Sequence, residues 1–66
     1  MKILLNGTAL DLDEGRRIVD LLVQEGLSER RVAVEVNGEI VPRGLHGEHA
    51  LHEGDRVEIV HALGGG

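Results

Sequence analysis

The sequence predicts an α+β fold in which a mixed sheet of four to five strands packs on one main helix, in the order ββαβββ. Three observations predict it. Apolar residues alternate with polar ones at both ends of the chain, one segment between them has helical spacing, and Asn-Gly pairs separate strands. A single helix covers one face of a sheet, so the expected layers are one sheet and one helix.

The first two strands are expected to form a hairpin. Met1, Ile3 and Leu5 alternate with Lys2 and Leu4, and the alternation resumes over residues 8–12. The intervening Asn6-Gly7 pair tolerates the positive φ angles of a tight turn. Two strands joined by such a turn are antiparallel.

The helix follows the hairpin. Ile18, Leu21 and Leu22 have the three-to-four spacing of a buried helical face, and Val19 and Val23 are expected to widen that face.

The two ends of this helix carry unequal signals. Gly26 is suited to a C-terminal cap, and Leu27 can fold back over the last turn. At the start, Arg16 and Arg17 occupy positions where Ser, Thr or Asp would cap better, and their charge opposes the helix dipole. Asp20 partly offsets this weakness.

Three further strands complete the expected sheet. Residues 32–36 form a β-branched strand that ends at Asn37-Gly38, and residues 40–42 form a short strand ended by its proline. Residues 43–54 read as an irregular connector, with Asp55 after Gly54 expected to form a turn. The last strand spans residues 56–61.

This element order allows the first and last strands to lie side by side at the centre of the sheet. That is the β-grasp, or ubiquitin-like, arrangement. The sequence therefore predicts one β-grasp domain over residues 1–63, followed by a flexible Gly-Gly-Gly tail over residues 64–66.

Composition excludes several classes of function. The chain has no cysteine, so it has no disulfide, thiolate metal site or cysteine nucleophile. Its net charge of −5 argues against nucleic-acid binding, and the absence of Phe, Trp and Tyr removes base stacking. The apolar run at the N-terminus is too short for a signal peptide or a membrane span, so we expect a cytoplasmic protein with no membrane partner.

The histidines invite a metal interpretation. His46, His49 and His52 recur at intervals of three, but Gly44 and Gly47 disfavour the helix that would bring them together. We therefore expect a solvated histidine-rich loop and no metal site in this chain.

The glycine tail is the remaining candidate for chemistry. Val60, Ala62 and Leu63 are apolar immediately before Gly64-Gly65-Gly66, which is not typical of a solvated linker. Glycines without Cβ atoms can enter a narrow channel and approach a bound nucleotide closely. The carboxylate of Gly66 could then attack the α-phosphate of ATP, and we expect it to be available without proteolytic processing.

Two stretches resemble the ThiS family of thiamine-biosynthesis sulfur carriers. Residues 36–43 read Val-Asn-Gly-Glu-Ile-Val-Pro-Arg, which is similar to the family's Asn-Gly-x-x-Val-Pro-Arg segment. Residues 53–66 are similar to its Gly-Asp strand leading into the glycine tail. The family commonly has Thr where this chain has Arg17, and usually has an aromatic residue where this chain has His46.

The resemblance implies a sulfur carrier that is not itself an enzyme. Gly66 would be adenylated by an E1-like partner of the ThiF type, which would hold the ATP and zinc, while the carrier itself binds no cofactor. Sulfur drawn from cysteine by a desulfurase would convert Gly66 to a thiocarboxylate. A thiazole synthase of the ThiG type would receive it, and Val60, Ala62 and Leu63 would contact partners.

Three other functions stay open at this point. A small subunit of a molybdopterin synthase would use the same chemistry of the tail to supply sulfur to a different pathway. A ubiquitin-like modifier would join Gly66 to lysines of target proteins. A regulatory or toxin-like binding domain would not use the tail at all.

Overall fold

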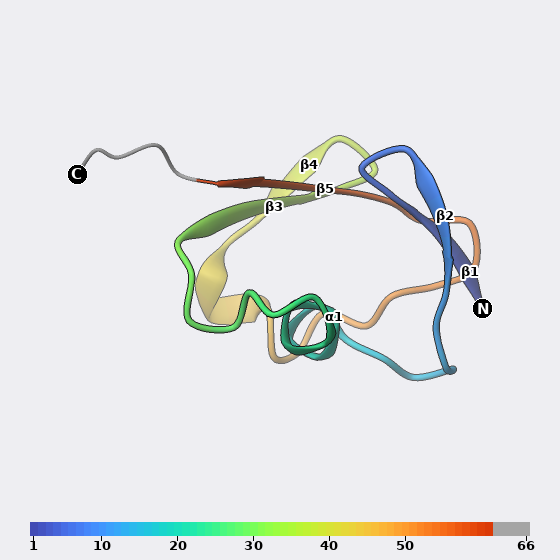
Figure 1. The fold of residues 1–66 in the computed structure, drawn as a ribbon, viewed down its shortest axis with the longest axis horizontal. Coiled ribbons are helices and arrows are strands. Elements are labelled where there is room, and N and C mark those ends of the chain that lie inside the picture. The colour runs from blue at the N-terminus through green and yellow to red at the C-terminus, as the bar shows by residue number, and fades with distance from the viewer. Residues whose placement is uncertain (62–66) are drawn as a thin grey trace.

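In the computed structural model, which describes residues 1–61, a mixed sheet of five strands carries one α-helix on one of its faces (Figure 1). The elements in chain order are β1 (Lys2–Leu5), β2 (Thr8–Asp11), α1 (Ile18–Gln24), β3 (Val32–Val36), β4 (Glu39–Val41), a 3₁₀ turn (Arg43–Leu45) and β5 (Arg56–His61). This confirms the predicted α+β class and the ββαβββ order.

The strands lie in the order β2-β1-β5-β3-β4. β1 and β5 are parallel, whereas β1–β2, β3–β4 and β3–β5 are antiparallel. The first and last strands are therefore neighbours in the interior of the sheet, as in the β-grasp arrangement that the sequence predicts.

Both Asn-Gly pairs adopt the backbone conformation expected for tight hairpins. Asn6 and Gly7 have φ angles of 48° and 84°, and Asn37 and Gly38 have φ angles of 52° and 87°. Asparagine and glycine tolerate this left-handed region better than other residues. These pairs therefore set the β1–β2 and β3–β4 connections.

The start of α1 is capped by the connector that precedes β5. The N–H of Ile18 donates to the carbonyl of His49 at 3.1 Å, and the N–H of Val19 donates to the carbonyl of His46 at 3.0 Å. The Arg17 N–H donates to the Asp20 carboxylate at 2.9 Å. Backbone carbonyls from a distant loop thus bind amides that a helix leaves without partners, which explains how α1 begins without a Ser or Thr cap.

The end of α1 follows the prediction. Gly26 has a φ angle of 74°, and its N–H donates to the carbonyl of Val23. The N–H of Leu27 donates to the carbonyl of Leu22 at 2.7 Å, and Leu27 packs against the core. This pair of bonds is a Schellman motif.

Among residues 1–61, the structure contains no helix with the length and apolar character needed to span a membrane.

An aliphatic core lies between the helix and the sheet. It consists of the buried residues Ile3, Leu12, Ile18, Leu21, Leu22, Val34, Val36, Val41, Leu51, Val57 and Ile59. The expectation that Val19 and Val23 widen the buried helical face is wrong. Val19 is 39% exposed and Val23 is 61% exposed, because the sheet covers only the face formed by Ile18, Leu21 and Leu22.

Candidate functional site

Strand β5 connects the interior of the sheet to the tail. It runs beside β1 at its start, where Leu4 pairs with Arg56, and beside β3 along its whole length, where Val32 pairs with His61. The buried side chains of Val57 and Ile59 anchor it to the core. The end of β5 and the N-terminus of β1 lie at opposite ends of the long axis of the molecule (Figure 1).

Two asparagine side chains hold β5 from its two sides. Asn6 accepts a hydrogen bond from the Ile59 N–H at 2.8 Å and donates to the Ile59 carbonyl at 3.4 Å. Asn37 accepts from the Arg56 N–H at 3.0 Å and donates to the Asp55 carboxylate at 3.0 Å. The same residues that make the hairpin turns therefore also fix the position of the strand that precedes the tail.

The face of the sheet away from α1 carries an apolar edge near the end of β5. Val60 is 55% exposed and pairs across the sheet with Ala33. Ile40, which is 68% exposed, pairs with Glu35 on the same face. We call these four residues, together with Glu58, the outer face.

Glu35 and Glu58 of the outer face lie directly opposite each other on β3 and β5. Neither carboxylate forms an ion pair in the part of the chain that the structure describes. Like charges in directly paired positions of antiparallel strands repel and lower stability. The outer face therefore presents uncompensated negative charge beside the exposed Val60.

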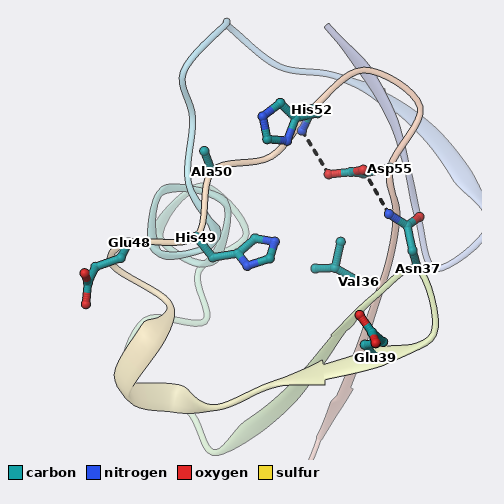
Figure 2. Close-up of a pocket in the computed structure, with 8 residues that line it drawn as sticks. All are labelled: Val36, Asn37, Glu39, Glu48, His49, Ala50, His52 and Asp55. Atoms are coloured by element: carbon teal, nitrogen blue, oxygen red, sulfur yellow. Dashed lines mark hydrogen bonds between the residues drawn. The ribbon is translucent and has the colours of Figure 1, made fainter.

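A pocket of about 440 Å³ lies at the other end of β5, next to Asp55 (Figure 2). Residues from the β3–β4 hairpin and from the connector before β5 line it: Val36, Asn37, Glu39, Glu48, His49, Ala50, His52 and Asp55. The Asp55 carboxylate accepts from the His52 N–H at 2.9 Å as well as from Asn37. The predicted turn at Asp55 is thereby confirmed. Both oxygens of its carboxylate accept hydrogen bonds within the fold.

The expectation of a solvated histidine loop is wrong for His46. This side chain is 6% exposed, and its Nε2 lies 3.0 Å from the carbonyl oxygen of Val41. It is drawn inward because its backbone carbonyl caps α1. His49 is half-buried and His52 is exposed. Within residues 1–61, no group of three or more His, Cys, Asp or Glu side chains is placed to hold a metal ion.

Comparison with known proteins identifies the family. The family model described as ThiS matches residues 3–66. This chain belongs to the ThiS family. The sulfur carrier protein ThiS of Escherichia coli K12 is 30% identical over 66 residues, with both chains covered completely. The crystal structure of the thiamine biosynthesis protein ThiS from Geobacter metallireducens superposes with a TM-score of 0.85 at 30% identity, again covering both chains.

A longer relative also matches the whole of this ThiS-family chain. A thiazole synthase of Magnetococcus marinus is 42% identical over 66 residues, but the chain spans only 20% of that protein. A ThiS-like segment therefore occurs within a chain that carries the name of thiazole synthase.

The predicted site residues of this ThiS-family chain fall into two groups. Val60 is exposed on the outer face, as a residue that contacts partners must be. Ala62, Leu63, Gly64, Gly65 and Gly66 lie outside the described residues, so their roles stay predictions, as do the domain boundary at residue 63 and the cytoplasmic location. Sequence reasoning missed the Asn6 and Asn37 side chains as clamps on β5, because it assigned them only to turns.

Proposed function

We propose that this chain carries sulfur for thiamine biosynthesis as a thiocarboxylate on Gly66. The observation that supports the proposal best is that β5, an interior strand of the sheet, leads directly through apolar residues to three glycines. Membership of the ThiS family supports the same role. The carrier is a substrate of its partner enzymes and has no catalytic role of its own.

The chemistry requires three steps. The Gly66 carboxylate attacks the α-phosphate of ATP, so that a C–O–P anhydride forms and pyrophosphate leaves. A persulfide, which a desulfurase forms with sulfur from cysteine, then attacks the carbonyl carbon, and AMP leaves with the former carboxylate oxygen. A thiol reductant then cleaves the resulting acyl disulfide and releases the thiocarboxylate. This is covalent activation of an otherwise poor acyl donor. ATP and zinc belong to the E1-like adenylating partner.

We propose thiazole synthase as the protein that receives the sulfur. A ThiS-like segment within a protein named thiazole synthase supports this pairing. The outer face and the apolar residues Ala62 and Leu63 would contact both partners. An apolar residue next to unpaired glutamates suits a partner surface with basic side chains around an apolar patch.

The direct test is intact mass spectrometry after incubation with ATP, an E1-like adenylating enzyme and a sulfur donor. Replacing one carboxylate oxygen by sulfur raises the mass by about 16 Da, after activation as in other acyl transfers. Deleting Gly66 should abolish this product while the urea unfolding midpoint stays unchanged. Sulfuration of the shortened chain would refute the proposal, and conjugation to lysines of other proteins would identify a modifier instead.

The contact role of Val60 is tested by a matched pair of variants. Val60→Asp and Ala9→Asp add the same charge to exposed positions on the same side of the sheet, but Ala9 lies on β2, two strands away from β5. We expect Val60→Asp to slow thiocarboxylate formation at limiting partner concentration by at least about tenfold, the effect of losing 1.4 kcal/mol of binding. Ala9→Asp should leave the rate near that of the wild type. Equal rates for the two variants would exclude Val60 from the contact.

A further inference from the structure

This chain has few primary amines, and they lie at its N-terminal end. The sequence contains one lysine, Lys2, and its other basic side chains, apart from histidine, are six arginines. An acyl-adenylate is attacked by amines and thiols as well as by a sulfur donor. The chain has no thiol, so its amines are the groups that could consume its own activated tail.

Lys2 lies beside the residues that precede β5, whereas His61 ends that strand. The Lys2 N–H donates to the Glu53 carboxylate at 2.9 Å, and its carbonyl accepts from the Gly54 N–H at 2.8 Å. It is therefore level with Gly54, just before β5, so at least the length of that strand, or about 17 Å, separates it from His61. The five residues after His61 span at most about 17 Å even when fully extended. Acylation of Lys2 by its own tail would require that full length to reverse along the sheet.

The amino group of Met1 lies next to Lys2 in the chain. It donates to the Leu12 carbonyl at 2.6 Å and lies 3.4 Å from the Glu14 carboxylate. Both contacts hold this amine at the N-terminal end of β1, away from the end of β5 (Figure 1).

At the end of the sheet that contains His61, the nearest basic residue before β3 is an arginine. Arg31 immediately precedes Val32, which pairs with His61. A guanidinium stays protonated at any pH at which proteins function, and it does not compete as a nucleophile. His61 itself can attack an acyl-adenylate, but an acyl-imidazole remains an activated acyl donor and passes its acyl group to sulfur or water.

We propose that this distribution of amines is a specificity device that protects the activated Gly66 from self-acylation, with Arg31 as the position where lysine is excluded. The inference rests on the proposed function. In the reaction that is avoided, a neutral amine attacks the Gly66 carbonyl, a C–N bond forms, the bond to the leaving group breaks, and a proton passes to solvent. The product, an internal amide, could no longer accept sulfur.

The test uses a chain made with an alkyl thioester on Gly66, so that no partner enzyme is needed. Arg31→Lys places an amine next to the residue that pairs with His61, and Arg16→Lys makes the same change of side chain in the loop between β2 and α1, which lies away from the end of β5 (Figure 1). Each protein is held in mildly alkaline buffer at low concentration and followed by intact mass. Internal amide formation releases the thiol and leaves a product about 18 Da lighter than the free acid.

We expect the wild type and Arg16→Lys to yield the free acid, and Arg31→Lys to yield the internal amide at least about tenfold faster than either. The amine at residue 31 precedes the residue that pairs with His61, and joining two groups in one chain raises their effective concentration. Peptide mapping should locate the amide at residue 31. Equal amide formation in all three proteins, or none in Arg31→Lys, would overturn the inference. Either result is independent of the adenylation assay, which alone decides the proposed function.

Discussion

The two ends of β5 are held in different ways. At its start, the strand lies between β1 and β3, the Leu4 N–H donates to the Asp55 carbonyl at 2.9 Å, and Asn37 bonds both Asp55 and Arg56. At its end, β3 continues beside it to His61. On the side of β5 that faces β1, the last hydrogen bonds within the described residues join the Asn6 side chain to Ile59.

The two ends of β5 therefore differ: its start is fixed by the core, and its end is exposed. The start of β5 is enclosed on both sides, so it transmits the rigidity of the core. The end of β5 extends past the β1–β2 hairpin with an exposed Val60, so a partner can approach it without disturbing buried contacts (Figure 1).

The largest effect on stability is expected from a matched pair of valines on β5. Val57→Ala should lower the free energy of unfolding by about 2 kcal/mol, because it removes two methyl groups from a fully buried site and leaves a cavity. Val60→Ala should change it by less than about 0.5 kcal/mol, as for most surface substitutions. Urea unfolding measures both. Similar losses of unfolding free energy in the two variants would contradict the conclusion that the start of β5 is fixed by the core while its end is exposed.

An intermediate effect is expected from the two asparagine clamps. Asn6→Gly and Asn37→Gly both keep a residue that tolerates positive φ, and each removes its side-chain bonds to β5. Each should cost about 1 kcal/mol, the usual contribution of a hydrogen bond. Amide hydrogen exchange should accelerate at Ile59 in the first variant and at Arg56 in the second. Uniform acceleration along β5 in both would show that the two ends are not held independently.

The smallest effect is expected at the acidic pair of the outer face. Glu58→Gln should raise the free energy of unfolding by about 0.3 kcal/mol at low salt, because it removes the repulsion by the paired Glu35. The gain should shrink in high salt, where exposed charges are screened. Glu29→Gln, at an exposed position in the loop before β3, serves as the control for loss of one negative charge. An equal gain in the control would assign the effect to net charge.

Local sequence signals predicted the strands, the turns and the end of the helix. Asn37-Gly38 and Gly26 impose their conformations through their own backbone preferences, so no distant residue was needed to predict them. The start of α1 could not be predicted in this way, because its caps come from the carbonyls of His46 and His49, far along the chain.

Burial of polar side chains was likewise beyond local signals. His46 is buried because its backbone position is fixed by α1, and Asn6 bonds a residue 53 positions away in the sequence. Val60 is exposed because alternation along β5 places it on the face opposite to the buried Val57 and Ile59, and its contact with partners stays a prediction. No hydrophobic pattern extends over residues 64–66, so only the chemistry of a terminal carboxylate and the family resemblance pointed to them.

The parallel pairing of β1 with β5 has a consequence for folding on the ribosome. Without β5, the chain consists of a β1–β2 hairpin and a β3–β4 hairpin that share no strand contact in the described sheet. Joining them requires closure of a loop of about fifty residues, a slow non-local step. The outer face is thus complete only when the last strand is inserted, so a chain whose synthesis has not reached β5 lacks it.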